Sequence, residues 1–559
     1  MDVNVRIAGE AGQGIVTAGN VLAGTLAEMG IHVFGTRNYE SRIRGGLNWF
    51  DIRAADHELN SRRETPDVLV AMTDEATEEL GPGVADEGVI IAEEGEDERL
   101  LQIDLGEEAK DVTGQKVMAN AVALGACFAL LGYDIETLCD YLKDEFKKHG
   151  EEVVEQNVQC VRRGAELAGD RGGCIDAPEP VDAPPTIYEG GEATGLGAAT
   201  AGVKVVTGYP MTPGTAVLTY LAQHGDEYGI VMEQAEDELS AINMVCGATY
   251  AGVPALTATS GGGFALMCEG LSLSGMMELP AFIVLAQRPG PATGLPTRTG
   301  QQDLQFVIRG GHGEFPRLVL APGTHRQCYQ LVRQGLELAH RYQSPAILLT
   351  DTFLVDCQKN IPELDESVRP IDRHVEENPS EDYVRYEVTE DGVSPRAVPG
   401  YGAFVVSDSD EHNEEGHITE DFDVRIAQQD KRMRKEDGLK SEMIEPERYG
   451  AQDADHVLVA WGSTYMPCRE AVDILTERGK SVAMVHFPQV WPLDAELSRR
   501  VLGADGSADE PRFTCIEGNA TGQFASILKQ RDILPDCETM LRYDGRPFTA
   551  DEIVERCEQ

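Results

Sequence analysis

The stretch Gly202-Val203-Lys204-Val205-Val206-Thr207-Gly208-Tyr209-Pro210-Met211-Thr212-Pro213-Gly214-Thr215 predicts a strand, a rigid loop and the start of a helix. Residues 202–207 favour a short buried strand, and the two prolines and two glycines of residues 208–215 favour a loop. A loop that leads into a helix N-terminus presents backbone N–H groups, and here also the Thr212 hydroxyl, to an anionic ligand. An ordinary turn explains the same residues equally well, so the rest of the chain has to decide between these interpretations.

The segment around this loop predicts a mostly parallel, doubly wound sheet. We expect a domain over residues 189–370, in which strands and helices alternate. The expected strands are residues 202–207, 256–259, 281–286, 317–320 and 346–350, and the expected helices are residues 236–251, 263–277 and 325–341.

The remaining segments predict further α/β domains, which makes the fold class multidomain α/β. Residues 1–172 open with a strand, a glycine turn, a helix and a second strand, which is a βαβ start. Residues 173–188 are rich in proline and glycine and predict a linker. Residues 371–450 predict an acidic connector with a charged helix near residues 424–439, and residues 451–559 predict a last α/β domain.

The charge of the chain excludes several classes of partner. Among 559 residues, 96 are Asp or Glu and 47 are Lys or Arg, so the formal charge is −49. Such a surface repels nucleic acid and anionic membranes, so we expect neither as a partner. A hydrophobic fraction of 42% argues against disorder. The simplest account is a halophilic protein from a high-salt cytoplasm, where salt screens the charge.

Neither the apolar segments nor the cysteines point to a membrane or a metal. The chain has no run of 18 apolar residues, and its first residues enter a strand without a signal-peptide pattern, so we expect a cytoplasmic protein. None of the twelve cysteines is separated from another by only two residues. We therefore expect buried thiols and no zinc or iron–sulfur site within this chain.

A second glycine-rich turn lies near the N-terminus. In Gly9-Glu10-Ala11-Gly12-Gln13-Gly14 the glycines occupy relative positions 1, 4 and 6, whereas a dinucleotide fingerprint needs positions 1, 3 and 6. Gly12 and Gly14 could cradle a phosphate at the helix N-terminus, or the segment could be a tight turn without a ligand. Arg37, Arg42 and Arg44 follow, either as phosphate or carboxylate contacts or as solvated surface charges.

An acidic cluster opens the expected helix at residues 236–251. Glu233, Glu236, Asp237 and Glu238 lie there, and the helix dipole explains most of them. Helical spacing places Glu238 with Ile242 and Gly247 on the packed side. A carboxylate at an apolar edge is a candidate for proton transfer.

Two further loops follow strand ends. Ser260-Gly261-Gly262-Gly263 leads from a strand into a helix through three glycines, and Arg288 and Arg298 follow the next strand. In open α/β sheets the carboxyl ends of the strands form the binding crevice. We therefore expect these loops to lie at one edge of the sheet, together with Thr212 and Glu238.

These motifs together resemble a known family. Residues 208–213 (Gly-Tyr-Pro-Met-Thr-Pro), 236–238 (Glu-Asp-Glu), 257–264 and 293–298 resemble the α subunit of 2-oxoacid:ferredoxin oxidoreductases. The resemblance is to the haloarchaeal-like type in which a γ domain is fused ahead of α, here residues 1–172. Residues 411–421 resemble a stretch between the family's α domains, and residues 451–559 resemble its transketolase C-terminal-like domain.

The resemblance implies roles for particular residues. Residues 189–370 would be the pyrimidine-binding domain of a thiamine diphosphate enzyme, with Glu238, or its neighbour Glu236, on the aminopyrimidine ring. Thr212 would contact the 2-oxoacid, and Arg298 with Arg288 would hold its carboxylate or the coenzyme A side. The resemblance adds further cofactor contacts at Tyr209, Pro210, Ser260, Gly261, Gly12 and Gly14.

The resemblance also implies a partner. The Gly-Asp-Gly start of a diphosphate–magnesium motif is missing, since Tyr543 precedes Asp544-Gly545. A β subunit would then supply the diphosphate site, Mg²⁺ and a [4Fe-4S] cluster, and this chain alone would be inactive. The complex would convert a 2-oxoacid and coenzyme A into acyl-CoA and CO₂ and reduce ferredoxin, with 2-oxoglutarate slightly preferred over pyruvate. Two alternatives stay open, a ferredoxin-independent thiamine diphosphate decarboxylase subunit and an accessory nucleotide-binding scaffold.

Overall fold

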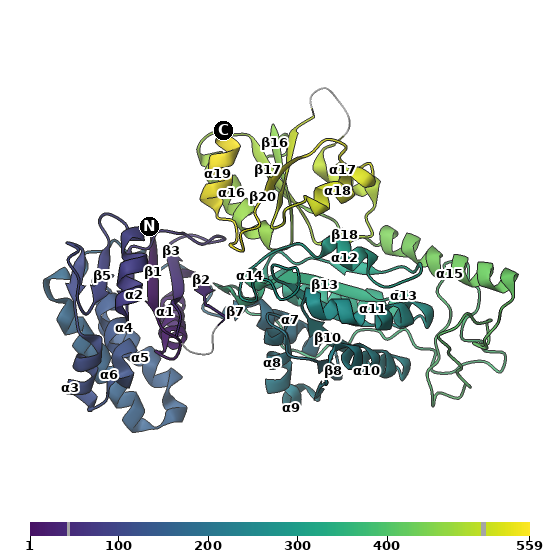
Figure 1. Ribbon diagram of the computed structural model, residues 1–559, viewed down its shortest axis with the longest axis horizontal. Helices are drawn as coiled ribbons and strands as arrows, with labels where there is room; N and C mark the ends of the chain where they lie inside the picture. Colours follow the sequence, from purple (N-terminus) through teal and green to yellow (C-terminus); the bar gives the residue numbers. More distant parts are fainter. Residues whose placement is uncertain (42–44, 505–509) are drawn as a thin grey trace. The chain divides into compact units, whose positions relative to one another are not determined.

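The computed structural model describes residues 1–41, 45–504 and 510–559, so Arg42 and Arg44 lie outside the described residues. The chain folds into two compact units (Figure 1). The first consists of residues 1–188 and 357–363, and the second of residues 189–356 and 364–559.

The first unit contains an eight-stranded sheet with the order β6-β5-β4-β1-β3-β2-β14-β7. Its strands are β1 (Asp2–Gly9), β2 (His32–Asn38), β3 (Asn48–Ala55), β4 (Val68–Ala71), β5 (Val89–Ala92), β6 (Leu100–Gln102), β7 (Ile187–Glu189) and β14 (Gln358–Asn360). Its helices are α1 (Ile15–Glu28), α2 (Asp74–Leu80), α3 (Leu105–Thr113), α4 (Ala119–Leu130), α5 (Ile135–Glu145) and α6 (Glu151–Ala168). The core consists mainly of Val, Ile, Leu and Ala side chains from the strands, α1 and α4.

The sequence from 173 to 188, for which we expect a linker, packs on the first unit. The Tyr133 hydroxyl donates to the carbonyl of Pro178 at 2.6 Å, and the Val181 N–H donates to the carbonyl of Gly30 at 2.9 Å. The segment then adds β7 to the edge of the sheet. These residues are therefore held by hydrogen bonds along much of their length.

The second unit contains the doubly wound sheet, with the strand order β18-β12-β13-β11-β10-β8-β9. Its strands are β8 (Val205–Gly208), β9 (Val231–Gln234), β10 (Ala255–Thr259), β11 (Phe282–Gln287), β12 (Leu318–Leu320), β13 (Ala346–Asp351) and β18 (Gln489–Trp491). All adjacent pairs are parallel except β12 with β18. Strands β10, β11 and β13 are buried throughout, as expected for a parallel sheet covered by helices on both faces.

Helices of the second unit pack in two groups. Helix α10 packs against α11, and α7 packs against both α8 and α13. The helices in this part are α7 (Gly190–Thr200), α8 (Thr215–Gln223), α9 (Gly225–Tyr228), α10 (Glu238–Tyr250), α11 (Gly261–Met276), α12 (Leu304–Arg309), α13 (His325–Tyr342) and α14 (Thr352–Asp356).

The connector and the last α/β segment complete the second unit. Residues 371–421 contain only an isolated bridge between His412 and Ile418 and lead into α15 (Phe422–Ser441). A five-stranded sheet follows, with β15 (Glu447–Gly450), β16 (His456–Trp461), β17 (Val482–Phe487), β19 (Arg512–Glu517) and β20 (Glu538–Leu541). Its helices are α16 (Tyr465–Glu477), α17 (Ala495–Leu502), α18 (Gln523–Gln530) and α19 (Ala550–Glu558). The expected multidomain α/β fold with a doubly wound sheet is thus confirmed.

Candidate active site

The Thr212 loop packs on the end of β10. A Cβ added at Gly214 would lie 2.7 Å from the carbonyl oxygen of Thr259, so only glycine allows this close approach. The Arg288 side chain, from the end of β11, donates from Nη1 to the carbonyl of Thr212 at 2.8 Å. The sequence therefore brings three strand-end loops together as expected, because parallel strands end at the same edge of the sheet.

Glu238 is buried at the first turn of α10, and its exposed fraction is 2%. The preceding Asp237 caps the helix by accepting from the N–H of Ser240 at 2.8 Å, so Glu238 is not needed as the cap. Glu238 Oε1 is buried and has no hydrogen-bond partner. Glu236, its rival in the sequence, is exposed.

The glycine triplet lies directly against this carboxylate. A Cβ added at Gly263 would lie 2.4 Å from Glu238 Oε1 and 2.0 Å from Thr259 Oγ1. Ser260 precedes α11 but makes no side-chain cap, and its buried Oγ has no hydrogen-bond partner. Glu238 Oε1 and Ser260 Oγ thus lie at the N-termini of two helices that pack together, and neither has a hydrogen-bond partner. Because buried polar groups are almost always hydrogen-bonded, a polar ligand could supply the bonds that these two oxygens lack.

Arg298 lies further along the same edge. Its carbonyl accepts from Thr352 Oγ1 at 2.9 Å, and the same hydroxyl contacts the carbonyl of Gln287 at 3.1 Å. The position is supported from the C-terminal segment, because a Cβ added at Gly545 would lie 3.0 Å from the Cβ of Arg298. The C-terminal α/β segment therefore shapes this side of the site.

The structure adds Asp303, which the sequence analysis missed. A Cβ added at Gly261 would lie 2.4 Å from Asp303 Oδ2, so this carboxyl lies against the start of α11. Its backbone N–H donates to Gln287 Oε1 at 2.9 Å. Burial raises the pKa of Asp303 to about 6. In the sequence an Asp before Leu304 resembles any helix cap, which left no signal to distinguish it.

Some positions that the sequence singles out in the second unit are exposed. Tyr209 and Pro210 are exposed at the tip of the Thr212 loop. Gly247, expected on the packed side of its helix with Glu238, is exposed, whereas Ile242 is buried as expected. The helix packs through Ala241, Ile242 and Val245, and this stripe turns Gly247 outward.

Gly12 and Gly14 belong to the first unit. They adopt positive φ values of 97° and 77°, which explains the glycines as a tight turn. A cavity of about 370 Å³ next to Gly12 has three acidic residues in its lining, Asp74, Glu93 and Asp104, and among the described residues that line it Lys116 is the one cation. These acidic side chains disfavour a phosphate there. Arg37 lies over the Phe50 ring, 5.3 Å from its centroid.

The described residues contain neither a metal-binding cluster nor a helix that could span a membrane. No group of three or more His, Cys, Asp or Glu side chains in residues 1–41, 45–504 and 510–559 could hold a metal ion. In the same residues, every helix is too short or too polar to cross a bilayer.

Comparisons with known proteins define the class of protein first. A family model described as pyruvate flavodoxin/ferredoxin oxidoreductase, thiamine diphosphate-binding, matches residues 196–431. A second model, pyruvate ferredoxin/flavodoxin oxidoreductase, matches residues 4–167. Both descriptions name oxidoreductases, and the two matches together cover residues 4–167 and 196–431.

Full-length relatives then give the family. The 2-oxoacid:ferredoxin oxidoreductase subunit alpha of a Sulfolobus species is 31% identical, covering 98% of this chain and 95% of that protein. The 2-oxoglutarate oxidoreductase subunit KorA of Mycobacterium tuberculosis is 29% identical, covering 99% and 90%. The chain belongs to the family of 2-oxoacid:ferredoxin oxidoreductase α subunits, as the motifs in the sequence indicated.

A solved structure is similar to this chain over its whole length. The 2-oxoglutarate:ferredoxin oxidoreductase from Magnetococcus marinus, with 2-oxoglutarate, coenzyme A and succinyl-CoA bound, has a TM-score of 0.91 to this chain and 32% identity. The match covers 100% of this chain and 99% of that one.

Proposed function

We propose that this chain, with a β subunit, catalyses the coenzyme A-dependent oxidative decarboxylation of a 2-oxoacid to acyl-CoA and CO₂ and passes the electrons to ferredoxin. The observation that carries the proposal is the buried, unpartnered Oε1 of Glu238 against the glycine triplet. A buried carboxylate oxygen without a hydrogen-bond partner favours a ligand that bonds to it.

The residues at this site fit thiamine diphosphate. Glu238 would hold a proton at a ring nitrogen of the aminopyrimidine, and the Ser260 hydroxyl would offer a second polar contact. The bound cofactor supplies the carbanion stabilisation that decarboxylation needs. Thr212 would orient the 2-oxoacid, and Arg298 is our candidate for its carboxylate, because guanidinium groups bind carboxylates in a bidentate manner. Glu238 and Thr212 together therefore form one wall of the site.

The other wall is assigned to a β subunit. The sequence has no Gly-Asp-Gly motif for a diphosphate and Mg²⁺, and no ligand-spaced cysteines for a cluster. We therefore assign the diphosphate site, Mg²⁺ and the [4Fe-4S] cluster to that subunit, with ferredoxin as the electron acceptor. The active complex contains at least one copy of each chain.

For the substrate we propose 2-oxoglutarate over pyruvate. The support is that the Magnetococcus protein and the Mycobacterium protein are both named for 2-oxoglutarate. Arg288, which contacts the Thr212 loop, and Arg298, whose carbonyl is bonded by Thr352, offer cations for a dicarboxylate. The test is the ratio of kcat/KM for the two acids in the complex. A higher value for pyruvate would reverse the order.

The decisive experiment is Glu238→Gln in the complex with the β subunit. We expect coenzyme A-dependent ferredoxin reduction to fall by several orders of magnitude, because the amide cannot hold the proton at the ring nitrogen. Glu236→Gln is the matched control, since Glu236 is two residues away but exposed, and it should keep near wild-type activity. Full activity of Glu238→Gln would instead favour an accessory scaffold. An active complex without iron–sulfur absorbance would favour a ferredoxin-independent decarboxylase.

A further inference from the structure

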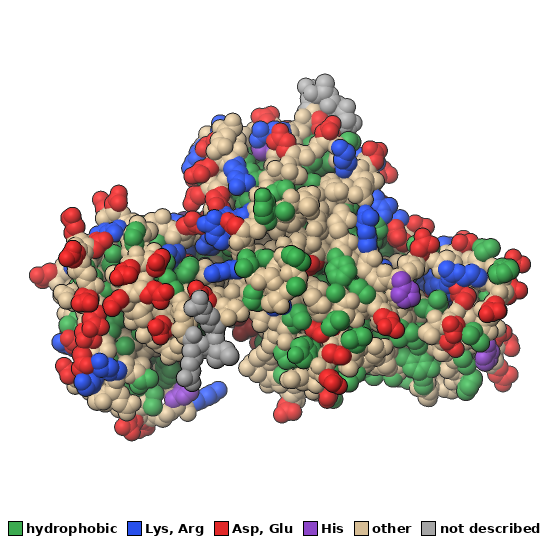
Figure 2. Space-filling model, in the orientation of Figure 1, with side chains coloured by type: hydrophobic (Ala, Val, Ile, Leu, Met, Phe, Trp, Pro, Cys, Tyr) green, Lys and Arg blue, Asp and Glu red, His purple; other side chains and the backbone are tan. Residues whose placement is uncertain are grey.

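Two helices of the second unit present an uncharged face in a very acidic chain. The exposed residues of α10 are Leu239, Asn243, Met244 and Gly247, and those of α11 are Gly262, Ala265, Leu266 and Glu269. Glu269 is the one charged residue among them, although 26% of the whole chain is charged. Figure 2 shows how densely acidic side chains cover other parts of the surface. Depletion of charge of this kind is typical of the centre of an interface.

The connector carries a second exposed apolar group. Phe404, Ile418, Phe422 and Ile426 are 88%, 61%, 84% and 59% exposed, and we call them the connector cluster. Phe422 and Ile426 are one turn apart on α15, so they face the same way. Figure 2 shows hydrophobic side chains where Figure 1 draws the first turns of this helix. Aromatic side chains so exposed on a soluble chain mark a contact surface.

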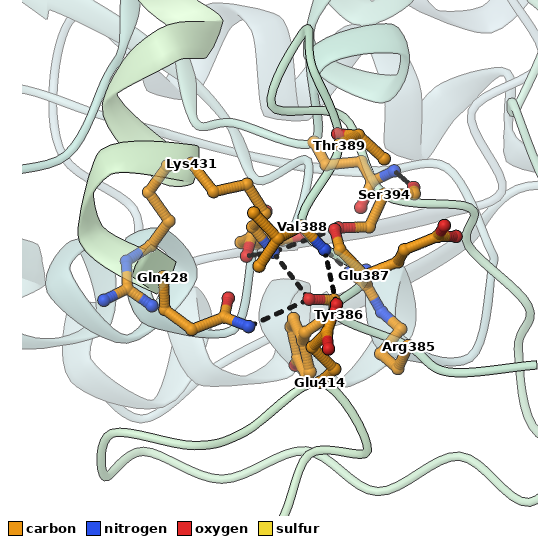
Figure 3. Close-up of polar contacts among 12 residues, drawn as sticks. Arg385, Tyr386, Glu387, Val388, Thr389, Ser394, Glu414, Gln428 and Lys431 are labelled. Atoms are coloured by element: carbon orange, nitrogen blue, oxygen red, sulfur yellow. Dashed lines mark hydrogen bonds and ion pairs between the residues drawn. The ribbon is translucent and has the colours of Figure 1, made fainter. Parts of the chain in front are cut away.

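Hydrogen bonds fix the part of the connector that lies beside α15. Gln428 of α15 donates from Nε2 to the carbonyl of Tyr386 at 2.9 Å, and the Val388 N–H donates to Glu414 Oε1 at 2.9 Å (Figure 3). Deeper in, Lys431 and Lys435 of α15 both bind the buried carboxylate of Glu278, which follows α11. The connector is thus fixed to the same helix layer that holds the active site.

The uncharged face and the connector meet at the end of α10. The hydroxyl of Tyr250, at the end of α10, donates to the carbonyl of Val405 at 3.2 Å, next to Phe404. A hollow of about 560 Å³ has residues of both in its lining, Asn243 of α10 and Ser409 and Arg425 of the connector, together with the charged side chains of Glu269, Glu314 and Arg432. Glu238 begins the same helix, which is about 20 Å long at 1.5 Å per residue.

The usual area of a stable interface indicates how far a partner that covers Glu238 would extend over this surface. A stable interface buries about 800 Å² per partner, which is a patch roughly 28 Å across. A partner that covers Glu238 and extends along α10 therefore reaches the connector. A second copy of this chain would bring the same charge of −49 and no diphosphate site of its own.

We propose that the connector cluster is a docking site for the thiamine diphosphate-binding iron–sulfur β subunit that completes the active site at Glu238. This inference rests on the proposed function. Phe422 and Ile426 act as apolar anchors at the far end of an interface whose near end is the active site.

The test measures binding between the full-length chain and a separately purified, thiamine diphosphate-loaded β subunit. The variant is Phe422→Ser combined with Ile426→Ser, since both side chains are exposed and their loss should leave the melting temperature of the isolated chain unchanged. We expect Kd to rise at least tenfold while kcat at saturating β subunit stays within twofold of wild type. Val368→Ser is the control, because Val368 is 47% exposed and its neighbour Arg369 bonds to Thr200 of α7, in the other helix group. The control should leave Kd unchanged.

The possible outcomes separate this proposal from the proposed function. A Kd within twofold of wild type for the double variant overturns the docking site. Loss of self-association of this chain in sedimentation, with Kd for the β subunit unchanged, assigns the cluster to a second copy and also overturns it. If the saturated wild-type complex shows no coenzyme A-dependent ferredoxin reduction, the proposed function fails, whatever Kd the variants give.

Discussion

At the residue level, the position of the Glu238 carboxylate depends on residue 263 being a glycine, which has no side chain. Gly263 lies against Glu238 and Thr259 without needing a positive φ, so its role is to leave space. Glycine in a helix normally costs stability, about 1 kcal/mol relative to alanine. The helix accepts this cost at Gly263 because the Glu238 carboxylate needs the space, whereas Gly261 leaves space for the Asp303 carboxyl.

Gly263→Ala should therefore impair catalysis while the chain stays folded. The new methyl group would push Glu238 away, and a displacement of about 1 Å can cost roughly 100-fold in rate. The measurement is kcat of the complex, with circular dichroism of the chain as a check on folding. Gly247→Ala is the matched control, since nothing lies within 4 Å of a Cβ added there. It should stabilise the isolated chain by about 0.5–1 kcal/mol. Wild-type kcat for Gly263→Ala would contradict this.

The raised pKa of Asp303 predicts a pH dependence of stability. Its pKa is about 6 in the folded chain against 3.8 for an ordinary aspartate, because it is buried. Between these values the folded chain holds a proton that the unfolded chain releases, so stability falls as pH rises from about 4 to 6. The loss is on the order of 3 kcal/mol. Asp303→Asn should lack this loss, so its melting temperature should gain on wild type between pH 4 and pH 7 at constant salt. A constant difference across that range would refute the assignment.

At the level of elements, α15 is held by buried charges and not by an apolar stripe. Glu278 meets Lys431 at 2.7 Å and also binds Lys435, and all three side chains are almost fully buried. Burial alone would raise the pKa of Glu278, but the two lysines and Arg385 hold it well below its ordinary value, so the carboxylate stays ionised. The connector therefore docks through an ionic core.

Removing the negative charge from this core should release α15. Glu278→Gln leaves two buried ammonium groups without their partner, which costs roughly 3–5 kcal/mol. Hydrogen–deuterium exchange over residues 422–441 should rise, and the melting temperature should fall. Replacing the triad by apolar residues, Glu278→Leu with Lys431→Met and Lys435→Met, should recover most of the stability. Unchanged exchange in Glu278→Gln would show that other contacts hold the helix.

The same elements show how far the sequence could predict the structure. The strand, loop and helix around Thr212 could be predicted, because β-branched residues, prolines and glycines act locally. The sequence also predicts a charged helix near residues 424–439, and in the structure α15 spans Phe422–Ser441. The sequence could not predict that this helix pairs with Glu278, because α15 has no apolar stripe that shows which face is buried. Strand β14, with the polar sequence Gln-Lys-Asn, had no strand pattern at all.

At the level of the whole molecule, charge should set the conditions for folding. The formal charge of −49 destabilises a compact chain through self-repulsion unless salt screens it. We expect the melting temperature of the isolated chain to rise steadily between 0.1 and 3 M KCl, since the screening length falls from about 10 Å to below 3 Å over this range. Dialysis into low salt should unfold it. A chain that stays equally stable in low salt would not be halophilic.

Strand β14 also determines how the two units can be separated. Asn360 donates to the carbonyls of Ile31 and Pro184 and accepts from the Val33 N–H, so a segment distant in sequence completes the first unit. The polypeptide crosses between the units at residues 188–189, 356–357 and 363–364. A protease nick within residues 173–188 would cut the chain into two polypeptides that stay together without a covalent link, because β14 of the C-terminal fragment pairs with β2 of the N-terminal one. A gene split at the same point would give an N-terminal product that lacks an inner strand of its own sheet. Two polypeptides divided at this point would therefore need a different sheet edge in the N-terminal product.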